Sequence, residues 1–181
     1  MVRARIIGFI LILFFFYSCS DNNKNSKPES GALTYFDIKG YFQAEAKRLS
    51  KKKSLVYKEI LKNDQKEAKK IQINNWDKEF SLFIESDINK PSWVSSYSVN
   101  KNNDTLVYKA LDPDLRTKEI KILKKAEKLL LISIKNEAAN KLYKSEEELY
   151  YFPDSLYKII KTQEVRIIGK NHYQISGEFA E

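Results

Sequence analysis

The stretch His-Tyr-Gln-Ile-Ser-Gly-Glu-Phe at residues 172–179 decides the fold class of this chain. Its odd-numbered positions carry Tyr173, Ile175, Gly177 and Phe179, whereas its even-numbered positions are all polar. Successive side chains of a strand point to opposite faces, so this period of two predicts a strand with one buried and one solvated face. Because antiparallel sheets commonly keep one wet face, the pattern favours an antiparallel sheet.

The same alternation recurs along most of the chain from residue 95, between short runs of turn residues. Seven strands are therefore expected there, over residues 95–100, 105–111, 117–124, 129–136, 141–151, 156–168 and 172–179. Residues 54–62 and 66–73 add a predicted hairpin around Asn63-Asp64, and its polar second arm is typical of a sheet edge. Short connections between successive strands imply antiparallel order.

Two helices are predicted ahead of the seven strands. Residues 32–50 carry an apolar stripe at three- and four-residue steps, and their basic end suits a helix C-terminus. Residues 75–88 place Trp76 and Phe80 on one face and stop before Pro91. The expected fold is therefore α+β: a meandering, curved antiparallel sheet of about seven to nine strands, packed on one long N-terminal helix and one short helix.

The first eighteen residues have the organisation of an export signal. Two arginines are followed by an apolar run over residues 6–17, which is too short to cross a bilayer comfortably. The run ends in Ser18-Cys19, and Cys19 is the single cysteine of the chain. A small residue followed by cysteine at this place resembles the lipobox of bacterial lipoproteins, although Phe16 stands where leucine is usual.

This resemblance implies that Cys19 becomes the first mature residue, acylated with fatty acids such as palmitate. Residues 1–18 are then a signal peptide, 19–31 the lipidated cysteine with a flexible tether, and 32–181 a single globular α+β domain. Ser20, rather than aspartate, follows the cysteine, which in such lipoproteins favours the outer membrane, on its periplasmic side or at the cell surface. An uncleaved anchor helix, or a secretory peptide cut by the ordinary peptidase, are the alternatives.

A second resemblance concerns the mature domain. The block Asp87-Ile-Asn-Lys-Pro-Ser-Trp93, together with Leu142-Tyr143 and Tyr173-x-Ile-x-Gly177, is similar to a pattern of small uncharacterised lipoproteins of the Bacteroidota. That group carries no known activity, so this resemblance implies a location and a fold but no reaction.

The residue types that most catalytic sites need are scarce. One His, one Cys and five Gly exclude a histidine–cysteine zinc cluster, a dinucleotide fingerprint and a P-loop. A serine triad would need His172, expected here as an exposed strand-edge residue on the solvent face. Glu146-Glu147-Glu148 and the pair Asp112 and Asp114 could supply glycosidase-type carboxylates, but a solvated strand and a turn explain them more simply. No catalytic residue, metal or cofactor is predicted.

The formal net charge is +8. Cleavage of the signal peptide would remove two of the positive charges, those of Arg3 and Arg5. Most basic residues are lysines interleaved with glutamates, and an exported protein lacks the usual nucleic-acid partner, so no nucleic acid is expected. One denser group is a candidate contact with an anionic membrane surface. It consists of Lys47, Arg48, Lys51, Lys52 and Lys53. Compensation of the helix dipole would explain the same residues.

Three functions remain open. A lipid-anchored envelope protein with a non-enzymatic binding or structural role, and an unknown protein partner, is favoured. A carrier or binding module would hold an apolar ligand, such as a lipid or lipoprotein acyl chain, in a groove of the sheet. It would need an apolar cavity of about 300 Å³ or more. A carboxylate-based envelope hydrolase is the least favoured.

Overall fold

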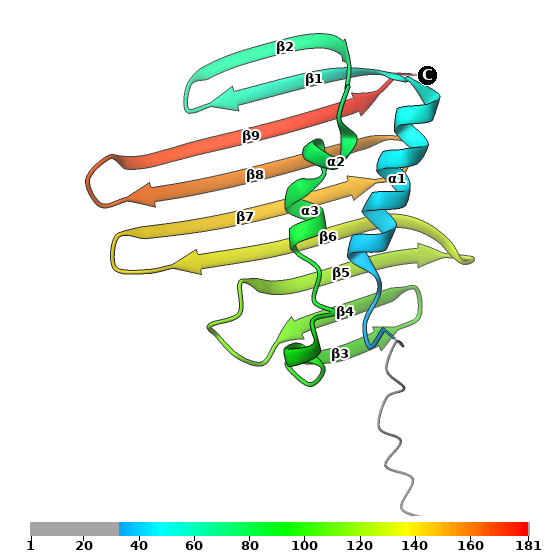
Figure 1. Ribbon diagram of the computed structural model, residues 1–181, viewed down its shortest axis with the longest axis vertical. Coiled ribbons are helices and arrows are strands. Elements are labelled where there is room, and N and C mark those ends of the chain that lie inside the picture. The colour runs from blue at the N-terminus through cyan, green and yellow to red at the C-terminus, as the bar shows by residue number, and fades with distance from the viewer. Residues whose placement is uncertain (1–32, 181) are drawn as a thin grey trace, which may run out of the picture. The chain divides into compact units, whose positions relative to one another are not determined.

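In the computed structural model, which describes residues 33–180, nine antiparallel strands form one open sheet in the order β2-β1-β9-β8-β7-β6-β5-β4-β3 (Figure 1). The strands are β1 (Leu55–Lys62), β2 (Gln65–Gln72), β3 (Tyr97–Asn102), β4 (Thr105–Ala110), β5 (Thr117–Lys125), β6 (Lys128–Ala139), β7 (Tyr143–Phe152), β8 (Leu156–Val165) and β9 (Gly169–Phe179). Strands β3 to β9 follow one another as a meander. The β1–β2 hairpin extends the sheet beyond β9.

The predicted antiparallel sheet is confirmed, with strand ends displaced by a few residues. Strand β2 lies at a sheet edge and is exposed along nearly all of its length, as its polar pattern predicts. Strand β9 has β1 on one side and β8 on the other. His172 is therefore not at a sheet edge, because the β1–β2 hairpin pairs with the strand that would otherwise be the last.

The long N-terminal helix predicted over residues 32–50 is not present. Helix α1 (Ile38–Lys52) begins later, because the side chain of Asp37 caps it by accepting a hydrogen bond from the backbone nitrogen of Gly40 at 2.7 Å. It ends at Lys52, and the next residue, Lys53, has a φ of 51°, the left-handed conformation typical of a helix terminus.

The helix predicted over residues 75–88 is divided into α2 (Trp76–Glu79) and α3 (Ser81–Glu85). Phe80, with φ −93° and ψ 10°, separates them. Backbone hydrogen bonds from Phe80 to Trp76 and from Ile84 to Phe80 still span the break, so both segments follow one line (Figure 1). A short 3₁₀ turn, η1 (Pro91–Trp93), leads on to β3.

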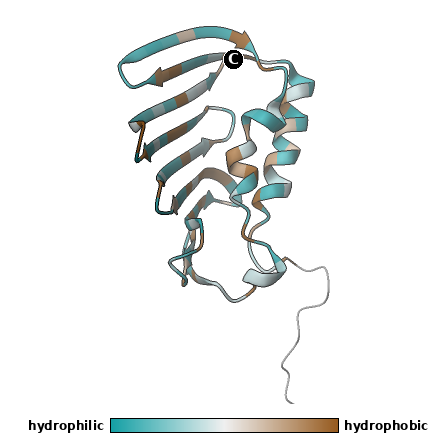
Figure 2. Cartoon of the chain, turned by 60° about the vertical axis from the view of Figure 1, so that its left-hand side comes forward, coloured by the Kyte–Doolittle hydropathy of each residue, from teal (hydrophilic) through white to brown (hydrophobic). Residues whose placement is uncertain are grey.

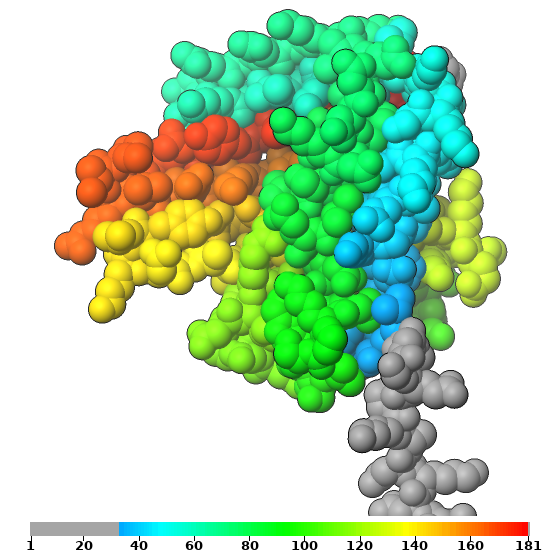
Figure 3. All heavy atoms as spheres, in the orientation of Figure 1, coloured from blue at the N-terminus to red at the C-terminus, as the bar shows by residue number. Residues whose placement is uncertain are grey.

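Helices α1, α2 and α3 cover one face of the sheet (Figure 2). Aromatic rings join the two layers: Tyr151 of β7 lies 5.1 Å from Phe42 of α1 and 5.6 Å from Phe80, measured between ring centroids. Such pairs contribute about 0.5–1.5 kcal/mol beyond the area that they bury. This aromatic layer fixes the helices over one half of the strands and leaves the β6–β7 and β8–β9 turns beyond the cover (Figure 3).

Strand register arranges the helix-facing side chains in rows across β1, β9, β8, β7 and β6. The row under the helices has two tyrosines at its centre: Lys58, Gly177, Tyr157, Tyr151, Ile132. The next row is aliphatic: Ile60, Ile175, Ile159, Leu149, Ile134. A polar row follows: Lys62, Tyr173, Lys161, Glu147, Asn136. Toward the uncovered turns, the two tyrosines under the helices thus give way first to aliphatic and then to polar side chains.

Candidate functional site

The predicted lipidation site, Cys19, lies outside the described residues. Between residues 33 and 180, no helix has the length and apolar character needed to cross a bilayer.

The predicted basic cluster divides into two parts. Its four lysines are exposed near the C-terminal end of α1: Lys47, Lys51, Lys52, Lys53. Arg48 is engaged instead by two carboxylates, since its guanidinium contacts both oxygens of Glu45 at 2.9 and 2.8 Å and Asp154 of the β7–β8 turn at 2.8 Å. The hydrogen bonds to Glu45 raise the pKa of Arg48. Arg48 therefore ties α1 to the sheet, whereas the lysines face solvent.

The glutamate run at residues 146–148 is not a cluster, because its side chains alternate between the two faces of β7. Glu147 points to the helix side and is 5% exposed. On the other face, Glu146 pairs with Lys144 at 2.6 Å and Glu148 accepts a hydrogen bond from the Tyr150 hydroxyl at 2.6 Å.

Asp112 and Asp114 occupy a turn. One side-chain oxygen of Asp112 accepts a hydrogen bond from the Asp114 backbone nitrogen at 2.8 Å, as in an Asx turn. His172 is half-buried on the face away from the helices, with Nδ1 at 3.2 Å from the Thr162 hydroxyl. Nowhere in residues 33–180 do three or more histidine, cysteine or acidic residues gather as a metal site would require.

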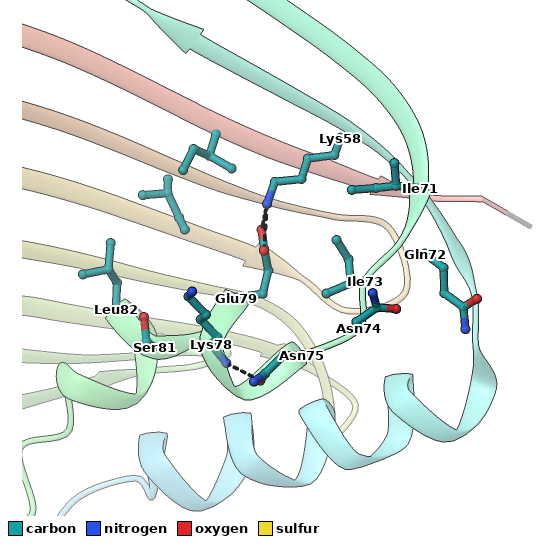
Figure 4. Close-up of a pocket in the computed structure, with 12 residues that line it drawn as sticks. Lys58, Ile71, Gln72, Ile73, Asn74, Asn75, Lys78, Glu79, Ser81 and Leu82 are labelled. Atoms are coloured by element: carbon teal, nitrogen blue, oxygen red, sulfur yellow. Dashed lines mark hydrogen bonds and ion pairs between the residues drawn. The ribbon is translucent and has the colours of Figure 1, made fainter.

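A crevice of about 440 Å³ opens between the α2–α3 segment and the strands β1, β2, β8 and β9 (Figure 4). It lies where the helical cover ends. Five aliphatic residues line it: Ile71, Ile73, Leu82, Ile159, Ile175. Asn75, Lys78 and Glu79 line its α2 side, and Lys58 of β1 reaches toward them from the sheet (Figure 4). None of these residues was expected from the sequence as part of a site.

An ion pair forms one wall of the crevice. The ammonium of Lys58 lies 2.6 and 2.7 Å from the two carboxylate oxygens of Glu79, and the Tyr157 hydroxyl donates to the nearer of them at 2.6 Å. Burial, reinforced by the Glu79 charge, raises the pKa of Tyr157. The hydroxyl therefore stays protonated as a donor, and the carboxylate is compensated from both sides.

A second polar cluster surrounds Glu147. Its carboxylate contacts Arg116 at 2.6 Å and Lys161 at 3.0 Å, and accepts from the Asn136 amide nitrogen at 3.3 Å. That nitrogen also donates to the Ser86 hydroxyl at 2.8 Å, which links the cluster to the residue after α3. Two cations thus compensate one buried carboxylate. The hydrogen bonds through Asn136 to Ser86 hold the loop after α3 over the sheet.

In both clusters, one charged residue at an inward position of a strand is visible in the sequence. Lys58 stands between Val56 and Ile60 in the inward positions of its strand, and Glu147 stands inward beside Leu149. A charge in the buried register of an alternating strand indicates a buried partner, because an unpaired buried charge is costly. The sequence pattern does not say which residue the partner is.

No protein-family model, curated protein or solved structure matches this chain.

Proposed function

We propose that this chain is a lipid-anchored protein of the bacterial outer membrane with a binding or structural role rather than a catalytic one. The observation that carries the proposal is the single cysteine, Cys19, placed directly after Ser18 and an apolar run. Acyl chains on that cysteine would supply about 0.8 kcal/mol per buried CH₂, and more than one chain gives stable attachment.

The state of the inward-facing charges supports a non-catalytic role. The carboxylate of Glu79 is held by Lys58 and Tyr157, and that of Glu147 by Arg116 and Lys161. A general acid or base has to reach a substrate proton. Carboxylates compensated in this way hold elements together instead.

Fatty-acid labelling in cells that process lipoproteins tests the anchor. The wild-type chain and Ser18→Ala, which keeps a small residue before the cysteine, are expected to incorporate the fatty acid and to fractionate with the outer membrane. Cys19→Ala should incorporate none and should retain residues 1–18. An unlabelled wild-type chain, or equal labelling of Cys19→Ala, contradicts the proposal.

The second candidate is a carrier or binding module for an apolar ligand such as an acyl chain. The crevice beside α2–α3 favours it, because its volume of about 440 Å³ exceeds the roughly 300 Å³ that small ligand sites need. The space under α1, by contrast, is filled by aromatic rings such as Phe42. A ligand held by the sheet would therefore have to lie outside the space under α1, as in this crevice.

Displacement of a fluorescent fatty acid tests this candidate. Ile73→Trp places a bulky ring in the crevice and should weaken binding about tenfold or more. Val99→Trp, at an exposed position of β3, is the matched control and should bind as the wild type does. Absence of binding by the wild-type chain, or unchanged binding by Ile73→Trp, rules out the crevice as the ligand site.

A further inference from the structure

Three large aliphatic side chains are exposed at neighbouring turns of the sheet. Leu142 in the β6–β7 turn is 61% exposed, and Ile167 and Ile168 in the β8–β9 turn are 90% and 75% exposed. The two turns touch, since the Arg166 backbone nitrogen donates to the Leu142 carbonyl at 3.0 Å. These three residues, called here the hairpin tip, lie on the part of the sheet that projects beyond the helices (Figure 3).

The backbone of this turn does not explain its isoleucines. Turns favour glycine, asparagine, aspartate, proline and serine, and the following Gly169 supplies the positive φ of 91°. The Ile168 backbone nitrogen closes the turn by donating to the Val165 carbonyl at 3.0 Å, a bond that any residue except proline could make. Contiguous exposed apolar side chains rimmed by polar residues mark an interaction surface.

Exposed cations flank the hairpin tip. Lys141, Arg166 and Lys170 are all exposed, and none of them forms an ion pair with another residue of the described part of the chain. Two exposed acidic residues lie beside Lys170: its cross-strand partner Glu164, and Glu146, which pairs with Lys144. Aliphatic side chains surrounded by long basic ones suit the surface of an anionic bilayer, where cations meet headgroups and apolar groups enter between them.

We propose that the hairpin tip inserts into the headgroup region of the membrane that carries the lipid anchor. The inference rests on that anchor. The fourteen residues from Cys19 to Ala32 span at most about 50 Å, whereas the eleven residues of β9 extend over about 37 Å. The Phe36 backbone nitrogen donates to the Tyr108 hydroxyl of β4, and β4 lies four strand spacings, about 19 Å, from β8. The diagonal from there to the tip is about 42 Å, so the tether is long enough for the anchor to reach the bilayer that the tip faces.

The shape of the tip favours a lipid surface over a protein partner. Stable protein interfaces bury about 1,200–2,000 Å² and need a complementary surface. Three side chains on a convex turn offer far less than this area, whereas a bilayer deforms around them. Anchor and tip would then hold the sheet to the membrane at two points.

Depth measurement on the full-length, lipid-anchored chain tests the proposal. Ile168→Cys is labelled with an environment-sensitive fluorophore in vesicles of phosphatidylethanolamine and phosphatidylglycerol. The exposed Lys128→Cys, at the other end of β6, is the matched control. Nitroxide-bearing lipids should quench the label at position 168 about threefold more strongly than at position 128, and phosphatidylcholine vesicles should reduce the difference.

Thiol labelling of the wild-type chain, whose single cysteine is Cys19, shows whether a negative result comes from the tip or from a missing anchor. An acylated Cys19 takes no thiol label, so labelled wild-type protein contradicts the anchor, and the tip is then measured in the Cys19→Ala chain. Equal quenching at positions 168 and 128 overturns the insertion. Shielding at position 168 that grows with the protein-to-lipid ratio points to a second copy and overturns it as well.

Discussion

Tyr151 and Tyr157 face each other across β7 and β8, and each donates its hydroxyl to a glutamate of a different helix. Tyr151 contacts Glu45 of α1, whereas Tyr157 contacts Glu79 of α2. A single cross-strand pair therefore positions both helices over the same two strands. The hydroxyl of each tyrosine holds one helix through its glutamate. The rings themselves are buried and fill the core between the sheet and the helices.

These buried tyrosines predict a loss of stability in alkali. Burial raises the pKa of Tyr151 and Tyr157, and raises that of Tyr97 to about 12. Unfolded tyrosines ionise near pH 10, so above that pH the unfolded chain binds fewer protons than the folded chain. The contribution of these groups is complete below pH 10 and declines as the pH rises toward the folded pKa values.

Urea unfolding at about pH 8 and about pH 11 measures this decline. In Tyr157→Phe one of the raised groups is absent, so its loss of stability between the two pH values should be smaller than that of the wild type. An equal loss in both proteins would show that the tyrosine hydroxyl is not a source of the pH dependence.

The Lys58–Glu79 pair predicts a non-additive double-mutant cycle. Both side chains are largely buried, at 16% and 14% exposed, so Glu79→Leu leaves an uncompensated ammonium and should cost about 2–3 kcal/mol of unfolding free energy. Replacing Lys58 by Met in the same chain should recover part of this loss. The pair Lys144–Glu146, at 58% and 51% exposed, is the control and should couple by less than about 1 kcal/mol. Additive losses at positions 58 and 79 would contradict a direct interaction.

Gly177 makes room for the Tyr157 ring. It is the cross-strand partner of Tyr157, and a Cβ at this position would lie 2.2 Å from the ring. Gly177→Ala should therefore displace the hydroxyl from Glu79 and cost about 1–3 kcal/mol. Gly169→Ala has open space around it and should show only the cost of its positive φ. Combined with Tyr157→Phe, the Gly177 substitution should still be costly, since the ring remains.

Asn89 joins the start of the described chain to the loop after α3. Its side chain accepts from the Tyr35 backbone nitrogen at 2.9 Å and donates to the carbonyls of Tyr35 and Phe36 at 3.2 and 3.1 Å. Asn89→Ala should lower the unfolding free energy by about 2–3 kcal/mol. It should also speed hydrogen exchange at Tyr35. Asn74→Ala, an exposed control, should change neither quantity. Slow exchange at Tyr35 in Asn89→Ala would contradict this role.

The sheet could be predicted from the sequence because its signals are local. Alternation such as that of residues 172–179 states which face of a strand is buried, and turn residues state where it ends. The start of α1 could not be predicted from its apolar stripe, because residues 33–37 continue that pattern while Asp37 caps the helix and Asn89 binds the preceding backbone. That contact joins residues far apart in the chain.

The candidate sites were less predictable for the same reason. The inward positions of Lys58 and Glu147 were visible in the alternation of their strands, but their partners Glu79, Arg116 and Lys161 come from elements brought near only by the sheet order. The crevice exists because α2 and α3 cover only part of the length of the strands beneath them (Figure 4). No local pattern encodes how far that cover extends.

The mass of the N-terminal peptide of the protein, isolated from its native membrane, tests the lipid anchor most directly. We expect this peptide to begin at Cys19 and to carry the added mass of a diacylglyceryl group together with an acyl chain on its amine. A peptide that begins at Met1, or that begins near Ser20 without any lipid, would contradict the proposed anchor and the membrane role built on it.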